Sequence, residues 1–456
     1  MISITPFDRQ ARSSMRPGIH RAVSLFSNCG AGDIGYAKAG FRFEVMAEID
    51  PRRLEVCLLN HPNAVGVPGD LRETWTSVVA EYRKKAGGVR PALLAACPPC
   101  QGLSTARSGR GKEEDADAGS KDERNLLVSI VSRVAKALQP DLVVLENVQA
   151  FLTRKIRHPK TEKPISAARL LIADLQQDYA VFPAATDLCD YGVPQTRKRV
   201  FLTFVRRDNK VLSRLIGNDS TPYPIPTFTK HFGKKPIVLR EALKRFGLPS
   251  LDAKSPKAAS SDIRGGLHSV PVWRDRRYDM VATIPANSGK TAWENTKCGK
   301  CGDVDVGKRR ASCPKCGGPL LRPVVKSKNG RYRLIHGFRA STYRRMKPDA
   351  PAATITTASG HIGSNHTIHP FENRVLSPLE CAYLQTFPKS FAWGEALDKW
   401  GHTNVRDMIG EAVPPLFTEL HGMVLLALLE GEEEAKFLSA DDIRCRGPRK
   451  KLLLPD

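Results

Sequence analysis

Short apolar runs recur along the first half of the chain, and each ends near glycine, proline or an acidic residue. Arg21 to Phe26 and Phe43 to Ile49 have the length of strands, and Ile34 to Ala39, which lies between them, has helical spacing. Ala92 to Ala96 and the apolar part of Asp141 to Val148 are typical of strands covered on both faces. This alternation predicts an α/β fold with a doubly wound, largely parallel sheet.

Later segments extend the pattern. Gly69-Asp70 ends a third candidate strand, Leu126 to Leu138 has helical spacing, and Ala180 to Val205 reads as a pair of strands. Phe417 to Glu430 is apolar on one face, which predicts a closing helix. From about 208 to 350 the content of Pro, Gly, Lys and Arg rises and the signals for regular elements weaken, so we expect a smaller, irregular lobe there.

The segment Cys97-Pro98-Pro99-Cys100 directly follows one of the buried strands. Two prolines fix the backbone before Cys100, and Gly102 relaxes it afterwards, so the thiol is predicted at the carboxyl end of a strand, where open α/β sheets bind their ligands. A proline-rich turn with an inert cysteine is the alternative for this segment taken alone. A redox pair is disfavoured because both central positions are proline.

Two further strand ends carry groups that suit a cofactor. Gly30 and Gly32 lie between a strand and a helix, where glycines let a ligand approach the backbone. Glu48 and Asp50 follow the next strand and could accept hydrogen bonds from ribose hydroxyls. The spacing alone does not distinguish S-adenosylmethionine from a nicotinamide dinucleotide.

Charged side chains mark two more strand ends. Glu146 ends an apolar strand, where a carboxylate needs a partner or a function. Arg197 and Arg199 alternate along an extended segment, so we expect both guanidinium groups on one face, suited to phosphates or to a base edge and a cofactor. A solvated hairpin is the alternative reading of the two arginines.

The charge of the chain is strongly positive and unevenly distributed. The formal net charge is +24, and residues 201–350 contain 32 lysines and arginines against 11 aspartates and glutamates. Such a segment predicts a phosphate-binding face, and hence a nucleic acid partner. Residues 1–20 lack the apolar run of a signal peptide and no apolar run reaches the length of a membrane span, so we expect a cytoplasmic protein without a membrane partner.

Four of the eleven cysteines form two Cys-x-x-Cys pairs inside the basic segment, namely Cys298 with Cys301 and Cys313 with Cys316. Each pair is followed by glycine, and paired thiolates at tight turns suit tetrahedral Zn²⁺. Because the four thiolates fill every position, we predict a structural zinc ribbon without an open site for water.

Several motifs, taken in order, resemble those of the cytosine carbon-5 DNA methyltransferases. Each is weak alone, but the whole series is specific, and it covers about residues 22 to 205 and 350 to 430. The motifs are Phe26-Ser-Asn-Cys-Gly30-Ala-Gly32, Glu48-Ile49-Asp50-Pro51, Gly69-Asp70-Leu71, Pro98-Pro99-Cys100-Gln101, Glu146-Asn147-Val148, Gln195-Thr-Arg197-Lys-Arg199, Arg374-Val-Leu-Ser-Pro-Leu-Glu380 with Leu384-Gln385-Thr-Phe387-Pro388, and Gly410-Glu-Ala-Val-Pro414-Pro415.

The resemblance implies a Rossmann-like methyltransferase lobe that binds S-adenosylmethionine. It carries the cofactor-binding role onto Phe26, Gly30, Gly32, Glu48, Ile49, Asp70, Leu71, Pro99 and Val413. This chain departs from the family pattern at three positions. Ser24 stands where an acidic residue is common, Asn28 replaces a glycine, and Glu411 stands where the family commonly has asparagine.

The resemblance also implies a mechanism that uses Cys100, Glu146, Arg197 and Arg199. Addition of the Cys100 thiolate at carbon 6 of cytosine turns the ring into an enamine that is nucleophilic at carbon 5. Glu146 would protonate or hydrogen-bond the ring nitrogen, and Arg197 would hold the base carbonyl and keep the thiol ionised. Water or a backbone-held base would remove the carbon-5 proton, and the base must leave the stacked duplex first.

We therefore predict a DNA (cytosine-5-)-methyltransferase that acts on double-stranded DNA, with a cognate restriction endonuclease as a candidate partner. The expected divisions are an extension (1–20), a catalytic domain (21–207), a target-recognition domain (208–350) with a zinc ribbon (298–316), a return to the catalytic domain (351–435) and a tail (436–456). A catalytically inactive DNA-binding protein and an RNA cytosine methyltransferase are the alternatives. Intact Cys100, Glu146 and Arg197 disfavour the first, and the large recognition segment disfavours the second.

Overall fold

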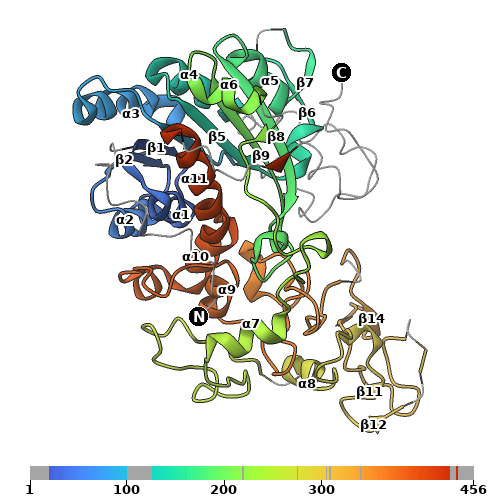
Figure 1. Ribbon diagram of the computed structural model, residues 1–456. Helices are drawn as coiled ribbons and strands as arrows, with labels where there is room; N and C mark the ends of the chain where they lie inside the picture. Colours follow the sequence, from blue (N-terminus) through green and yellow to red (C-terminus); the bar gives the residue numbers. More distant parts are fainter. Residues whose placement is uncertain are drawn as a thin grey trace.

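In the computed structural model the chain forms a seven-stranded sheet with helices on both faces, and a second, less regular part (Figure 1). The described residues are 20–99, 126–159, 161–217, 220–274, 276–304, 306–307, 310–338, 341–431 and 438–439. The strand order is β3-β2-β1-β4-β5-β9-β8. The strands span His20–Leu25 (β1), Phe41–Glu48 (β2), Val65–Pro68 (β3), Leu93–Ala96 (β4), Leu142–Asn147 (β5), Tyr179–Asp187 (β8) and Lys198–Arg206 (β9).

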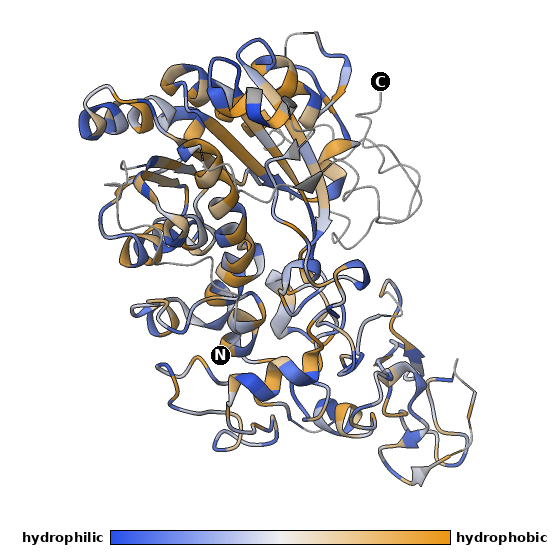
Figure 2. Ribbon diagram, in the orientation of Figure 1, coloured by the Kyte–Doolittle hydropathy of each residue, from blue (hydrophilic) through white to orange (hydrophobic). Residues whose placement is uncertain are grey.

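The first five strands in the sheet order run parallel, and β9 lies antiparallel between β5 and β8. Apolar residues are frequent along the central strands (Figure 2). Their side chains belong to one apolar cluster on each face of the sheet, because helices cover both sides. The predicted doubly wound α/β fold is confirmed. Each predicted strand and helix in this lobe is confirmed within a few residues of its predicted ends.

One face of the sheet packs on α3, α4 and α5, and the other packs on α1, α2, α6 and α11. Two helices begin with an aspartate as the N-cap residue, Asp50 in α2 and Asp70 in α3. The side chain of each aspartate accepts a hydrogen bond from a backbone N–H group in the first turn of its helix. The helices are α1 (Ala31–Ala39), α2 (Pro51–Asn60), α3 (Leu71–Ala86), α4 (Val128–Leu138), α5 (Ala167–Leu175), α6 (Lys210–Gly217), α7 (Leu239–Phe246), α8 (Arg276–Ala282), α9 (Pro378–Leu384), α10 (Ala396–Glu411) and α11 (Pro415–Glu430).

The second part of the molecule has two apolar clusters and short strand pairs. One cluster joins α7, α9 and α10 to the start of α1, and the other joins residues 251–293 to residues 343–375. Residues 362–375 therefore pack against the expected recognition region, although the predicted catalytic domain includes them. The domain boundaries at residues 207 and 350 remain predictions. The short pairs are β6 (Lys155–Arg157) with β7 (Pro164–Ser166), β10 (Ser220–Thr221) with β15 (Leu438–Ser439), β11 (Lys297–Cys298) with β12 (Gly302–Asp303), and β13 (Val324–Lys326) with β14 (Tyr332–Leu334).

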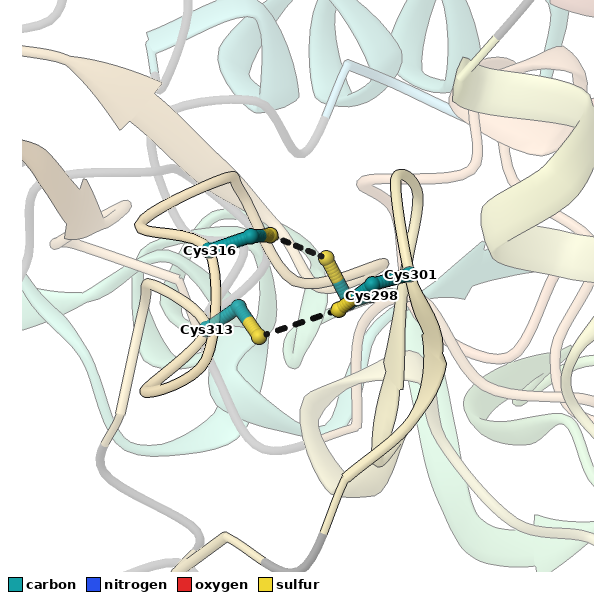
Figure 3. A group of neighbouring side chains, drawn as sticks. All are labelled: Cys298, Cys301, Cys313 and Cys316. Atoms are coloured by element: carbon teal, nitrogen blue, oxygen red, sulfur yellow. Dashed lines mark hydrogen bonds between the residues drawn. The ribbon is translucent and has the colours of Figure 1, made fainter.

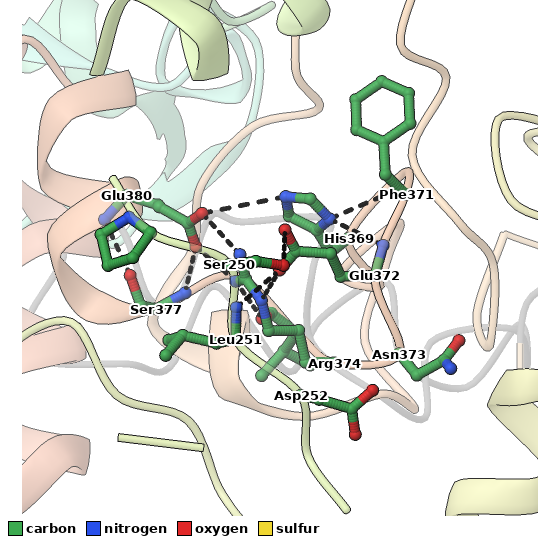
Figure 4. Close-up of polar contacts among 12 residues, drawn as sticks. Ser250, Leu251, Asp252, His369, Phe371, Glu372, Asn373, Arg374, Ser377 and Glu380 are labelled. Carbon is green, nitrogen blue, oxygen red and sulfur yellow. Dashed lines mark hydrogen bonds and ion pairs between the residues drawn. The ribbon is translucent and has the colours of Figure 1, made fainter. Parts of the chain in front are cut away.

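Buried charged groups join these two clusters (Figure 4). Arg374, which is 1% exposed, forms a two-point ion pair with Glu380 of α9 and a further pair with Glu372. Glu380 also closes a capping box with Ser377 at the start of α9. Arg345 donates to the carbonyls of Val281, Ile284, His369 and Glu372 and to Asn373 Oδ1. Two arginines thus hold together segments that are distant from one another in the sequence.

One helical stretch, residues 396–430, is long and apolar enough by composition to cross a membrane, although the sequence analysis found no single apolar run of that length. It consists of α10 and α11, which are separated by residues 412–414, and 61% of its most apolar window is buried inside the protein. That burial is typical of helices in a protein core.

Candidate active site

The turn after β1 has an unusual backbone that is fixed by contacts to β2 and α10. Phe26 and Asn28 have positive φ angles of 57° and 49°, and Gly30 follows with 73°. The two non-glycine residues cost on the order of 1 to 2 kcal/mol each, so surrounding contacts must hold them. Ser27 N–H donates to Ala47 O at 3.0 Å, and Asn28 Nδ2 donates to Met408 O at 2.9 Å.

Glu48, at the end of β2, is oriented by this turn. Its Oε2 accepts from Asn28 N–H at 2.8 Å and its Oε1 accepts from Asp50 N–H at 3.1 Å. The carboxyl is 5% exposed, and burial raises its pKa. A buried carboxylate with both oxygens aimed by backbone groups is suited to bind ligand hydroxyls.

A pocket opens between this turn, the ends of β4 and β5, and the start of α11. Phe26, Gly32 and Val413 from the predicted cofactor set line it, and so does Glu146 from the predicted catalytic set. The pocket therefore brings residues of the first and last motifs together with Glu146, the predicted catalytic carboxylate. Its other lining residues are Ser24, Leu25, Ser27, Asn28, Ala31, Asp33, Tyr36, Ala95, Ala96, Cys97, Val144, Phe201, Glu411, Ala412 and Thr418.

Two glycines of the turn are required by close neighbours. A side chain at Gly30 would meet the His61 ring and Cys57 Sγ within 3 Å, and one at Gly32 would lie 3.2 Å from Val413 Cβ. Gly30 thus allows tight packing under the turn, whereas Gly32 keeps the pocket open opposite Val413, and this opening fits S-adenosylmethionine. Glu411, at the departure from the family pattern, lines the same pocket and pairs with Arg53.

Six predicted cofactor residues lie outside the pocket lining, namely Gly30 and Glu48, whose contacts are given above, and Ile49, Asp70, Leu71 and Pro99. Ile49 is 63% exposed directly after β2, and Asp70 at the start of α3 is held by Arg72. That contact lowers the pKa of Asp70. Leu71 is buried in the core under α3, so only its backbone can reach a ligand, and Pro99 follows β4. Strands β1, β2 and β3 are neighbours and run parallel. Phe26, Ile49 and Asp70 come shortly after these three strands, so they lie along the same edge of the sheet.

Glu146 lies near the end of β5, and its side chain makes two contacts. Its Oε1 forms an ion pair with Arg199 Nε at 2.8 Å, and its Oε2 accepts from Cys97 Sγ at 2.8 Å. Glu146 is 6% exposed, so these contacts fix a largely buried carboxylate within the pocket. Cys97 was not among the predicted site residues, because nothing in its sequence position distinguishes it from a buried thiol.

The two arginines of the Gln195 motif have different partners, and their predicted catalytic roles stay a prediction. Arg197 is 1% exposed, and its guanidinium donates to the carbonyls of Ile355, Gly410 and Ala412. Arg197 therefore anchors the backbone beside Val413, and Arg199 is the arginine that contacts Glu146. Alternation along a strand could not distinguish these environments, since they depend on segments that come much later in the chain.

Cys100 lies outside the described residues, and the chain just before it is fixed. Asn147 Nδ2 donates to Pro98 O at 3.0 Å, which ties the end of β4 to the residue that follows Glu146. The register pairs Ala96 of β4 with Leu145 of β5. The Cys97-Pro98-Pro99 segment therefore leaves the sheet next to Glu146.

The four cysteines of the basic segment converge (Figure 3). Their sulfur atoms lie within 4.8 Å of one another, and the Cys298–Cys316 and Cys301–Cys313 sulfurs are each 3.5 Å apart. Four thiolates bound to Zn²⁺ at about 2.3 Å are spaced by about 3.8 Å, so the donor set fits that ion. Lys300 N–H and Lys315 N–H donate to Cys298 Sγ and Cys313 Sγ, as the two tight turns predict.

The sheet order, the glycine turn and the pocket fit the Rossmann-like methyltransferase lobe that the motifs predict. The sequence model of the C-5 cytosine-specific DNA methylase family matches residues 20–420, and the chain belongs to that family. It is therefore an enzyme of DNA methylation at carbon 5 of cytosine, and the predicted class and reaction are confirmed.

Curated relatives match over most of their length. The chain is 31% identical to the type II methyltransferase M.FnuDI of Fusobacterium nucleatum over 86% of this chain and 90% of that protein. It is 26% identical to M1.HgaI of Avibacterium volantium, over 87% of this chain and 95% of that protein. Among solved structures, the Entamoeba histolytica methyltransferase EhMeth is similar with a TM-score of 0.50 at 13% identity, covering 90% of this chain and 98% of that one. The last similarity shows the fold alone.

Proposed function

We propose that the enzyme methylates carbon 5 of a flipped-out cytosine within a specific sequence of double-stranded DNA. The shared pocket carries the proposal: Glu146 and the glycine turn line one cavity, and the loop that leads to Cys100 starts beside Glu146. The basic segment 201–350 supplies the charge for a duplex, which a compact pocket alone would not need. We expect it to act in the cytoplasm, where bacterial DNA lies.

In this proposal Cys100 adds to carbon 6 of the base and leaves again when the carbon-5 proton is removed. Glu146 hydrogen-bonds or protonates the ring nitrogen and so takes up the charge that develops on the base. Arg199 holds the Glu146 carboxylate in place through their 2.8 Å contact, and Cys97 holds its other oxygen. S-adenosylmethionine supplies the methyl group from its sulfonium when bound.

The cofactor is assigned to the turn after β1 and the strand ends beside it. Glu48 accepts from the ribose hydroxyls, Phe26, Gly32 and Val413 line the pocket, and Gly30, Ile49, Asp70, Leu71 and Pro99 complete the set. Arg197 has a positioning role, since it anchors the chain on either side of Glu411. These assignments agree with the packing of the first and last motifs against each other.

Zinc bound by Cys298, Cys301, Cys313 and Cys316 is the second ligand that we propose. The ribbon is attached by buried bonds: Arg322 donates to Asn295 O and to Arg310 O, and Asn295 Nδ2 donates to Met280 O near the end of α8. A folded ribbon fixed to the recognition region suits a structural ion. The names of the type II relatives make a cognate restriction endonuclease the candidate partner.

Bisulfite sequencing of plasmid from cells that express the chain tests the function. We expect protected cytosines at one recurring sequence, and none from the Cys100→Ala variant. DNA that carries 5-fluorocytosine at that sequence should trap the wild-type protein covalently, because the carbon-5 proton that must leave is absent. Unmethylated plasmid from cells with folded wild-type protein would refute the proposal.

A further inference from the structure

Asp33 is a pocket carboxyl that the mechanism above does not use. It lies in the first turn of α1, is 7% exposed and lines the same cavity as Phe26 and Glu146. A buried carboxylate is costly unless a cation or several donors compensate its charge. Its surroundings therefore decide what it does.

Two hydrogen bonds reach the Asp33 carboxyl, one from the Ser24 side chain and one from the backbone N–H of Asp33 itself. Ser27 Oγ donates to Ser24 Oγ at 2.9 Å, and the Ser24 side chain hydrogen-bonds Asp33. Within the described part of the chain, Asp33 has no ion pair with a lysine or arginine. Burial raises the pKa of Asp33 to about 7, so near neutral pH the carboxyl is poised between its two forms.

The groups packed around Asp33 supply no positive charge. Glu146 of β5 and Glu411 of α10 line the pocket and are each paired with an arginine, Arg199 and Arg53, respectively. The other titratable neighbours are neutral near pH 7: burial raises the pKa of the Cys29 thiol to about 12 and those of Tyr36 and Cys57 well above their usual range, and it lowers the pKa of His421, beside Tyr36, to about 3.

We propose that the Asp33 carboxylate binds a positive charge at the methionine end of S-adenosylmethionine. This inference rests on the proposed function, which brings that ligand to this pocket. The cofactor carries two cationic groups, its sulfonium and its ammonium, whereas the product S-adenosylhomocysteine keeps only the ammonium. A carboxylate with neutral hydrogen-bond donors and no cation is complementary to either group, and Ser24 keeps the adjacent position on β1 uncharged.

The proposal predicts that cofactor binding releases a proton. A bound cation lowers the pKa of Asp33, so the complex holds fewer protons than the free protein below about pH 7. Affinity for S-adenosylmethionine should therefore fall as the pH drops below 7, by at most about tenfold per pH unit for one proton. Asp33→Asn should bind the cofactor at least tenfold more weakly at pH 8 and show no such release.

Isothermal titration in two buffers of different ionisation enthalpy, at pH 7 and pH 8, measures affinity and proton release together. Glu411→Gln is the matched control, because it removes a carboxyl of the same pocket that already has Arg53 as a partner; it should retain the proton release. Asp33→Asn should also unfold at higher temperature than the wild type above pH 7 without cofactor, since it removes an uncompensated buried charge. That second measurement shows that the variant is folded.

Titration with S-adenosylhomocysteine separates the two cationic groups. Loss of affinity in Asp33→Asn for the cofactor only would assign the sulfonium, and an equal loss for both ligands would assign the ammonium; either result supports the proposal. Unchanged affinity for both ligands, with proton release retained, would overturn it. If such a variant still methylates plasmid DNA, only this inference fails; if the wild type binds neither ligand, the proposed function fails.

Discussion

Glu146 has the two contacts that a positioned acid needs, one to a cation and one to a thiol. The ion pair with Arg199 holds one oxygen, and Cys97 donates to the other. Because the carboxyl is largely buried, neither contact is weakened by solvent as a surface pair would be. Substitutions at these positions therefore test the site one atom at a time.

Glu146→Gln keeps the size of the side chain but removes its ability to deliver a proton. We expect the methylation rate to fall by about 100-fold or more, in the range of general acid catalysis. Affinity for S-adenosylmethionine should change little. Single-turnover methylation and cofactor titration measure the two effects, and near-normal turnover would mean that another group protonates the ring.

Cys97→Ala removes the donor to Glu146 Oε2 and leaves the Arg199 pair intact. A hydrogen bond to a charged group contributes about 1.5 to 3 kcal/mol, so we expect the rate to fall by roughly tenfold or more. Cys189→Ala is the control, since that buried thiol lies outside the pocket lining. Equal rates for the two variants would remove Cys97 from the site.

For single residues, the sequence predicted those that belong to a recognisable motif. It missed those whose environment depends on contacts with distant parts of the chain. Glu48 and Glu146 were predictable because each lies at the end of an apolar strand, where a buried carboxylate is costly unless it has a partner or a function. The different partners of Arg197 and Arg199 were not, because these side chains, two positions apart in the chain, reach different parts of the fold. Asp33 carried no signal, although the departure at Ser24 marked its partner.

Among the elements, the cysteine ribbon combines a recognisable motif with an anchored position. Its two turns bring four sulfur atoms together, and Arg322 and Asn295 attach the ribbon to the region around α8. The motif predicted the sulfur cluster from spacing alone. The anchoring could not be predicted, because its acceptors are backbone carbonyls in loops.

Cys313→Ser leaves three thiolates and an open position. Zinc binding to such small modules contributes on the order of 10 kcal/mol to folding, so we expect the ribbon to unfold locally and release one Zn²⁺ per chain. Cofactor binding should persist, because the sheet has its own core. Metal analysis, cofactor titration and the methylated sequence are the measurements, with Cys189→Ser as control; zinc-free wild-type protein would contradict the assignment.

Helix α9 begins at a buried ion pair that makes stability depend on pH. Arg374 and backbone hydrogen bonds lower the pKa of Glu380 to about 2 against the opposing effect of burial. A carboxyl whose pKa is lowered on folding stabilises the fold at pH values above its pKa in the unfolded chain. This contribution to stability is lost as the pH falls towards 2.

Glu380→Gln leaves Arg374 buried without its main partner, so we expect a loss of about 3 to 5 kcal/mol at pH 7. The difference from the wild type should shrink as the pH falls from about 4 towards 2, because the carboxyl then binds a proton in the unfolded chain but not yet in the folded one. Chemical denaturation at a series of pH values measures both. Glu419→Gln, at a partly exposed pair with Lys38, is the control and should change stability little.

The molecule as a whole divides its charge between a nearly neutral sheet domain and the basic segment 201–350, the predicted recognition region. The sequence predicted this division, because counting charges needs no structure. It could not predict that residues 362–375 pack with residues 251–293, since an apolar cluster is defined by contacts across the chain. Arg345 and Arg374 were likewise hidden, because buried arginines resemble surface arginines in sequence.

DNA binding should weaken steeply with salt, since each phosphate that the protein neutralises releases about one counterion. On the β13–β14 hairpin, Lys326 and Arg333 are exposed. The double variant Lys326→Ala, Arg333→Ala should lower affinity and reduce the slope of log K against log salt by about 1 for each phosphate that is no longer neutralised. Fluorescence anisotropy with a duplex measures the slope.

The control for this measurement is Lys84→Ala, on an exposed position of α3 in the sheet domain. It should leave the slope unchanged. The same slope for the hairpin variant and the wild type would show that the duplex does not touch these two side chains.

The pocket is built from two ends of the described chain, because Phe26 and Gly32 meet Val413 and Thr418 across it. During synthesis on the ribosome, the glycine turn emerges long before α11, and the recognition region emerges between them. A nascent chain therefore has no complete pocket until all of residues 208–350 have left the exit tunnel. In the division of labour that we propose, this order of the segments delays methyl transfer until the part that selects the DNA sequence has been made, so that a partly synthesised chain does not methylate DNA indiscriminately.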